Sequence, residues 1–152
     1  MAGGKVTVAH GRPDGIYGWV KLTGEVLAQT VADRFGISRI CYRPFTVYGP
    51  GQDADYPMVR DFLHVDDAVT GILATHDQAT LGGAMNLCTG IGTDFYAVAT
   101  LAAKIMEYSP RIVGDASKPS GEECRVGSPE LLRKWARPRT MIEDGLEAVL
   151  RG

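Results

Sequence analysis

The chain has 152 residues, of which 45% are hydrophobic and 22% charged, as is typical of one soluble globular domain. The net charge of -2 comes from scattered residues, so the sequence indicates neither a nucleic-acid-binding nor a membrane-binding surface. No apolar run approaches the roughly 18 residues of a membrane span, and no secretory signal is visible. Cys41, Cys88 and Cys124 are far apart and odd in number, which indicates neither a metal site nor a disulfide framework. We expect Cys41 and Cys88 to be buried thiols, and we expect a cytoplasmic protein.

The first half of the chain predicts a helix followed by a strand. Residues 1–16 are glycine-rich and form a lead-in or an edge strand. Two apolar stripes at helical spacing predict a helix over residues 17–35, and Gly36 suits its C-cap. A helix that is apolar on two sides is expected to pack between neighbouring elements. Residues 37–42 predict a buried strand, which Pro44 ends.

The second half predicts four further helices and one strand. The next helix begins at residues 65–67, where a carboxylate is well placed to cap it, and it runs to about residue 77. A buried strand follows at residues 84–88, and then a helix that Thr93 or Asp94 caps and that ends near residue 108. Residues 109–127 are irregular. Helix starts are predicted at Ser128-Pro129-Glu130 and at the capping box formed by Thr140 and Glu143. This alternation of strands and helices predicts an α/β fold with a parallel sheet.

Tyr17 and Lys21 are the first candidates for chemistry, because their spacing of four residues stacks a phenol and an ammonium on one helix face. A fixed cation favours the ionised form of a phenol, so such a pair can act as a general acid and base. The motif alone is weak, because a surface helix that carries an aromatic residue and an extended lysine would look the same.

Three further motifs follow in order and give the pair a context. They are Arg43-Pro44-Phe45-Thr46-Val47-Tyr48-Gly49-Pro50-Gly51, Arg60-Asp61-Phe62-Leu63-His64-Val65-Asp66-Asp67-Ala68 and Met85-Asn86-Leu87. Together with the Tyr17 motif they resemble the NAD-dependent epimerase/dehydratase family of extended short-chain dehydrogenases. The resemblance implies a Rossmann-like α/β fold and a site for a nucleotide-diphosphate sugar with NAD, NADP not being excluded.

The resemblance implies a role for each candidate residue. Tyr17 would exchange a proton with a sugar hydroxyl, and Lys21 would favour its ionised form and bind the nicotinamide ribose. The apolar side chains at positions 44, 45 and 47 (Pro44, Phe45 and Val47) would border the nicotinamide, although a turn with core aromatics would also explain them. Substrate contacts would come from Thr46, which replaces the usual asparagine, and from Arg60 and Lys118 on the phosphates. His64 is a tempting base, but we expect a structural histidine.

Two parts of the family pattern are missing. No strand followed by a glycine-rich phosphate-binding turn is present, and no serine or threonine stands upstream of Tyr17 as in the family. Only residues 52–59 separate the second and third motifs, where the family has a helix and a strand. We therefore expect one domain over residues 1–152 that resembles the C-terminal half of the family: a lead-in (1–16), the remainder of a Rossmann-like core (17–108) and a segment resembling the substrate lobe (109–152).

Two functions remain open at this point. The chain is an NAD-dependent epimerase or dehydratase of nucleotide sugars that depends on a cofactor-binding half. Alternatively, it is a non-catalytic remnant or interaction module that self-associates or is complemented by another chain. In the family the helix over residues 17–35 often lies in a dimer interface, so we expect a homo-oligomer through it. The sequence predicts no metal site.

Overall fold

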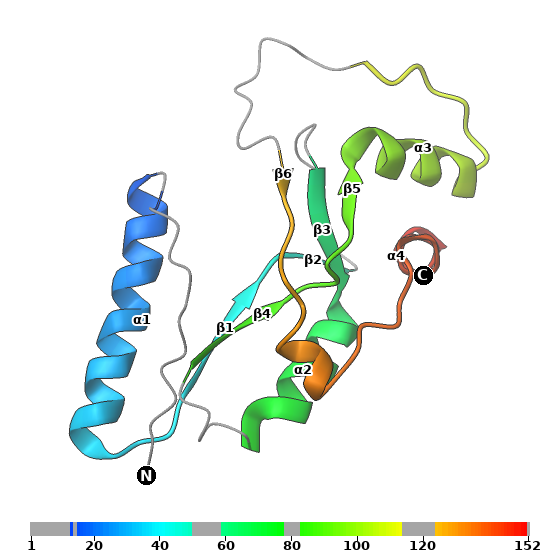
Figure 1. The fold of residues 1–152 in the computed structure, drawn as a ribbon. Helices are drawn as coiled ribbons and strands as arrows, with labels where there is room; N and C mark the ends of the chain where they lie inside the picture. Colours follow the sequence, from blue (N-terminus) through cyan, green and yellow to red (C-terminus); the bar gives the residue numbers. More distant parts are fainter. Residues whose placement is uncertain (1–12, 14, 50–58, 78–82, 114–123, 152) are drawn as a thin grey trace.

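Helices and strands alternate along the chain in the computed structural model, which describes residues 13, 15–49, 59–77, 83–113 and 124–151. The elements are, in chain order, α1 (Ile16–Phe35), β1 (Ile40–Pro44), β2 (Thr46–Tyr48), β3 (Val59–His64), α2 (Val65–Thr75), β4 (Gly83–Leu87), β5 (Gly92–Asp94), α3 (Phe95–Ile105), β6 (Cys124–Arg125), the 3-10 helix η2 (Leu132–Lys134) and α4 (Ile142–Arg151). Figure 1 shows the strands at the centre, with α1 at one margin and α3 and α4 at the other. The α/β prediction is confirmed.

The strands form two small sheets. β1 and β4 pair in parallel, with Ile40 opposite Gly83 and Pro44 opposite Leu87. β3 pairs in parallel with β2 and β6 and antiparallel with β5. The parallel pairs confirm the predicted sheet type, but the second sheet is mixed. Within the described residues β1 has β4 as its one partner strand, so the other edge of β1 stays open.

The core lies where the two sheets meet α2 and η2. Its buried side chains are Leu63, Ala68, Met85, Leu87 and Leu132. Gly71 lets α2 approach this cluster, because a Cβ at position 71 would lie 3.1 Å from Leu132 Cδ1 and 3.3 Å from Leu87 Cδ2. The alternation of buried residues along β3 and β4 therefore holds α2 against both sheets.

The first helix confirms the prediction for residues 17–35 in its bounds but not in its surroundings. Gly36 ends α1 with a left-handed φ of 64°, as expected of a C-cap glycine. However, α1 buries only Ala32 among its side chains. The expectation that both apolar stripes are packed between neighbours is therefore wrong for the described structure. The physical reason is that β1 has no partner strand beyond it, so no described element covers the outer faces of α1 (Figure 1).

Two helix starts are resolved by their caps. The N-cap of α2 is His64, whose Nδ1 accepts a 3.3 Å hydrogen bond from the Asp66 backbone N–H. The predicted carboxylate cap is therefore wrong, because the imidazole already occupies that position. Asp94 caps α3 by accepting a 2.8 Å bond from the Ala97 N–H, so one of the two alternatives for that helix is confirmed.

The end of the chain departs most from its local signals. Ser128-Pro129-Glu130 leads only to the three-residue η2 (Leu132–Lys134). Thr140 does not cap α4, which begins at Ile142. Instead, the Thr140 N–H donates to Asp67 Oδ2 at 2.9 Å and the Arg139 N–H donates to Oδ1 at 3.1 Å. A tertiary contact with α2 therefore replaces the local capping box.

Gly145 is where α4 closes over the second sheet. A Cβ at position 145 would lie 2.0 Å from Tyr48 Oη and 3.1 Å from His64 Cδ2. We expect Gly145→Ala to lower the free energy of unfolding by about 1–3 kcal/mol, because this overpacking outweighs the gain in helix propensity. Urea denaturation followed by circular dichroism measures the change.

The Tyr48 hydroxyl gives the control for that substitution. It is buried without a hydrogen-bond partner among the described residues, so Tyr48→Phe removes the atom that would clash most. We expect the double variant Gly145→Ala/Tyr48→Phe to recover part of the loss, since Tyr48 Cζ would still lie 2.9 Å from the new Cβ. Equal stability of the single variant and the wild type would rule out the close approach.

Candidate functional site

Tyr17 and Lys21 form one exposed unit on the first turns of α1. Lys21 Nζ lies 5.1 Å from the centroid of the Tyr17 ring, within the range of a cation–π interaction. Tyr17 is 74% exposed. The spacing of four residues therefore stacks the two side chains as expected, and it leaves the phenol and the ammonium accessible to a ligand.

The candidate wall at the end of β1 divides between the surface and the core. Pro44 is exposed, whereas Val47 packs against the core cluster. The Phe45 N–H donates to the Leu87 carbonyl at 3.0 Å, and its ring lies so close to Gly127 that a Cβ there would sit 2.8 Å from it. Thr46 pairs with Phe62 of β3 and is half-buried. The side-chain contacts that the structure gives Phe45 and Val47 are packing contacts.

Arg60 lies apart from the pair on α1. It is half-buried in β3, where its neighbours are Thr93 of β5 and Arg125 of β6, and its Nη1 donates to the Val59 carbonyl at 2.8 Å. In the view of Figure 1, β1 and β4 lie between α1 and β3. Lys118 lies outside the described residues.

Asp61 holds the neighbouring loops together. Its side chain is fully buried, and its Oδ1 accepts bonds from the Thr89 N–H at 2.8 Å and the Thr89 hydroxyl at 2.6 Å. Oδ2 accepts from the Gly90 N–H at 2.8 Å and the Gly127 N–H at 3.2 Å. This carboxylate joins β3 to the loop after β4 and to the loop before η2. Its contacts support an architectural role.

The phenol of Tyr48 and the thiol of Cys88 differ from the exposed phenol of Tyr17 because they are buried. Burial raises the pKa of Tyr48 to about 12, and the charges of Asp67, Glu143 and Asp144 add to the effect. Burial also raises the pKa of Cys88 to about 12, with a contribution from Asp61. Both groups therefore stay protonated at neutral pH and are poorly suited to acid–base or nucleophilic chemistry there. The prediction that Cys88 is a buried thiol is confirmed, whereas Cys41 is only partly buried.

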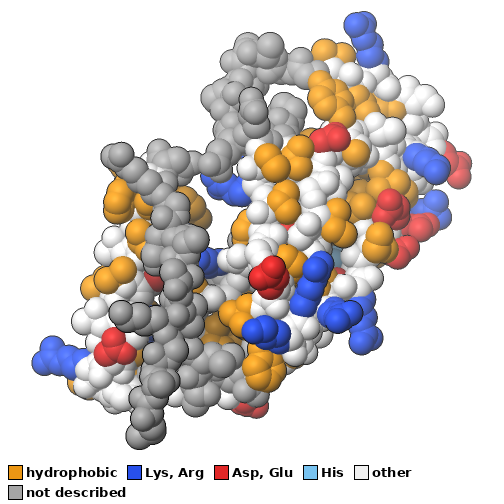
Figure 2. Space-filling model, in the orientation of Figure 1, with side chains coloured by type: hydrophobic (Ala, Val, Ile, Leu, Met, Phe, Trp, Pro, Cys, Tyr) orange, Lys and Arg blue, Asp and Glu red, His pale blue; other side chains and the backbone are white. Residues whose placement is uncertain are grey.

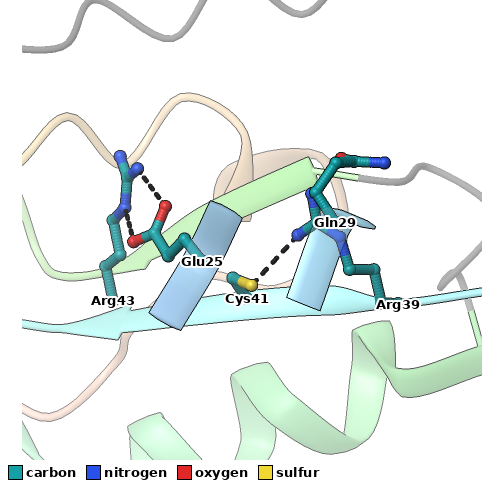
Figure 3. A network of polar contacts seen from close by, with 5 residues as sticks. All are labelled: Glu25, Gln29, Arg39, Cys41 and Arg43. Carbon is teal, nitrogen blue, oxygen red and sulfur yellow. Dashed lines mark hydrogen bonds and ion pairs between the residues drawn. The ribbon is translucent and has the colours of Figure 1, made fainter. Parts of the chain in front are cut away.

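A network of polar side chains between α1 and β1 did not follow from sequence reasoning. Arg43 donates two hydrogen bonds to Glu25, from Nε at 2.6 Å and from Nη2 at 2.5 Å. Arg39 donates to Gln29 and, at 3.0 Å, to the Cys41 thiol (Figure 3). The four-residue spacing places Glu25 and Gln29 on the same side of α1, but it does not indicate their arginine partners.

The described residues fit one end of a dinucleotide better than the other. An exposed ammonium beside an exposed phenol can form hydrogen bonds with a ribose hydroxyl. The described residues supply no glycine-rich strand-to-helix turn for a pyrophosphate. In the same part of the chain, no group of three or more His, Cys, Asp or Glu residues could hold a metal ion, and no helix has the length and apolar character to cross a membrane.

Comparison with known proteins identifies related chains. A family model described as the NAD dependent epimerase/dehydratase family matches residues 4–59. A Bacillus subtilis (strain 168) protein named uncharacterized UDP-glucose epimerase YtcB is 29% identical over 158 residues, which cover 86% of this chain and 49% of that protein. The chain thus spans about half the length of this relative.

Solved structures share the fold. RMD from Pseudomonas aeruginosa complexed with NADPH matches with a TM-score of 0.84 and 22% identity, over 99% of this chain and 61% of that one. UDP-glucuronic acid 4-epimerase from Bacillus cereus, in complex with UDP-glucuronic acid and NAD, matches with a TM-score of 0.82 and 23% identity. That match covers 93% of this chain and 53% of the epimerase. These likenesses confirm the Rossmann-like α/β fold.

Proposed function

We propose that the chain is part of an NAD-dependent epimerase or dehydratase of nucleotide-diphosphate sugars, because residues 4–59 match the model of the NAD dependent epimerase/dehydratase family. The observation that carries this proposal is the exposed stack of Tyr17 and Lys21 on α1. A phenol and an ammonium that stack and remain accessible are the groups that proton exchange with a sugar hydroxyl needs. The chain spans about half of its relatives, so the complete site includes residues from a cofactor-binding half.

In this proposal Tyr17 exchanges a proton through its Oη with a hydroxyl of the sugar. Lys21 holds the phenol in place and donates a hydrogen bond to the nicotinamide ribose. NAD, or NADP, supplies hydride acceptance and return when bound. The exposed Pro44 borders the nicotinamide side, and Phe45 and Val47 support this border from the packed side.

The substrate contacts lie on other parts of the chain. Thr46 contacts the sugar, for which its hydroxyl can donate one hydrogen bond and accept others. Arg60 binds the diphosphate, because a guanidinium matches phosphate oxygens in a bidentate way. Lys118 adds a second cation to the phosphates. These roles come to this chain through the family motifs in which Thr46 and Arg60 stand.

A second candidate, an interaction module, is favoured by the surface of α1. Large apolar side chains there are more than half exposed, among them Val20, Leu27 and Phe35, and Figure 2 shows hydrophobic side chains at the margin of the molecule where α1 lies. Apolar surface of this kind favours association. Under this proposal the chain forms a homo-oligomer through α1 or is complemented by another chain, and a monodisperse monomer in light scattering would contradict self-association.

The catalytic proposal is tested by turnover. The chain is incubated with NAD and UDP-glucose, alone and with a cofactor-binding half from a relative added, and the sugar signals are followed by proton NMR. We expect new anomeric signals from an epimer or the signals of a keto product from dehydration. Unchanged spectra under both conditions would argue against an epimerase or dehydratase.

A further inference from the structure

The side chains along one face of α1 divide into an exposed half and an anchored half. Tyr17, Lys21, Glu25 and Gln29 follow one another at intervals of four residues, so they form one stripe along the helix. Tyr17 and Lys21 contact each other at its exposed start. Glu25 and Gln29 contact Arg43 and Arg39 of the β1 region (Figure 3). The groups proposed for the chemistry and the groups that hold the helix therefore share one stripe.

The two anchoring contacts show that α1 and the segment 39–43 run in opposite directions. Glu25 precedes Gln29 on α1, whereas its partner Arg43 follows Arg39, the partner of Gln29. Two contacts about one helical turn apart fix the rotation of a helix about its axis as well as its position. Lys21 is one step of four residues, about 6 Å of rise, from Glu25. The orientation of Lys21 thus depends directly on where Glu25 is held.

The Glu25–Arg43 contact is the stronger of the two anchors. It is a bidentate pair with N···O distances of 2.6 and 2.5 Å, and its side chains are only 23% and 31% exposed. The hydrogen bonds that Arg43 donates to Glu25 are the main reason why the pKa of Arg43 is raised above its ordinary value. A charge-assisted bidentate pair restricts geometry more than a single contact does. Since α1 buries only Ala32, apolar packing contributes little to holding this helix.

We infer that Glu25 and Arg43 are positioning residues that fix the rotation of α1 and so set the orientation of Tyr17 and Lys21. Neither residue touches substrate or cofactor in this role. The inference rests on the proposed function for its catalytic meaning, but its structural content can be tested separately.

Hydrogen exchange measured by mass spectrometry on the 152-residue chain tests the pair. Glu25→Gln keeps the shape of the side chain and removes its charge. We expect amide exchange in residues 16–35 to rise by roughly ten-fold, while exchange in β3 and β4 stays within about two-fold, because local opening of α1 needs no global unfolding. Arg43→Lys, which keeps the charge but cannot form the bidentate contact, is expected to give a smaller rise.

The matched control is Glu147→Gln. Glu147 forms an ion pair with Arg151 at 3.2 Å within α4, where the side chains are 53% and 59% exposed, and exposed pairs of this kind contribute little. Amide exchange in α1 of the Glu147→Gln variant is expected to equal that of the wild type. Two results for the Glu25→Gln variant would overturn the inference. If amide exchange rose equally in all elements, the pair would stabilise the whole fold, and if exchange in α1 did not rise, the pair would not hold the helix.

Fluorescence anisotropy of Trp19 gives a second measurement that a general loss of stability does not move. In a Trp135→Phe background, Trp19 reports on the first turns of α1, and Glu25→Gln is expected to speed its depolarisation at temperatures where the protein stays folded. Unchanged anisotropy would overturn the inference. A parallel titration with NAD separates the two proposals: failure of the wild type to bind NAD contradicts the proposed cofactor, whereas exchange and anisotropy decide the positioning role.

Discussion

We expect Tyr17→Phe to lower turnover of a nucleotide-diphosphate sugar by about 10²–10⁴-fold, the range that a general acid or base contributes. The substitution removes one oxygen from a side chain that is 74% exposed and contacts Lys21. Its effect on folding is therefore expected to stay within about 0.5 kcal/mol. The measurement is the initial rate of product formation by NMR, compared with that of the wild type under the same condition.

Tyr96→Phe is the matched control for this substitution. Tyr96 is the second residue of α3, as Tyr17 is the second residue of α1, and it is 47% exposed. A variant that loses this hydroxyl is expected to keep the wild-type rate. Equal rates for Tyr17→Phe and the wild type would remove Tyr17 from the chemistry, even if the chain proved to be an active enzyme.

The largest effect on stability is expected from Asp61→Asn. The four hydrogen bonds that Asp61 accepts are divided evenly between its two oxygens. An asparagine has one acceptor oxygen, so its amide group would face donors on one side whichever way it turned. We expect the free energy of unfolding to fall by about 2–4 kcal/mol, because buried N–H groups lose their acceptor. Urea denaturation followed by circular dichroism provides the measurement.

Asp94→Asn is the control for that charge removal. Asp94 also accepts a backbone hydrogen bond, from Ala97, but at an exposed helix start. Asparagine caps a helix about as well as aspartate, so we expect a change of no more than about 0.5 kcal/mol. If the two variants lost the same stability, the architectural role assigned to Asp61 would be wrong.

Local signals predicted α1 and β4 well because those signals are short in range. The spacing of apolar residues and the glycine at position 36 determine the bounds of α1, and the apolar run after residue 82 determines β4. The candidate pair Tyr17–Lys21 was found in the same way, since two residues that are four positions apart on a helix lie on the same face. The roles of Arg60 and Thr46 came instead from the motifs in which they stand, and that of Lys118 from its place in the chain. All three stay predictions.

Tertiary contacts explain what local signals missed. Asp67 was expected near a helix cap but accepts hydrogen bonds from Arg139 and Thr140, more than 70 residues away. Spacing cannot indicate such a partner. The exposure of α1 was missed for a related reason, because apolar stripes predict a packed helix only where neighbouring elements exist to cover them. The open edge of β1 supplies none among the described residues.

Calorimetric titration of the chain with NAD tests the central claim most directly, which is that α1 presents part of a dinucleotide site. We predict saturable binding that Lys21→Ala weakens by roughly ten-fold, because one charge-assisted hydrogen bond to the ribose is lost. Lys104→Ala, which removes an exposed lysine from the last turn of α3, should bind NAD as the wild type does. Heats equal to those of dilution, or equal binding by Lys21→Ala and the wild type, would contradict the claim.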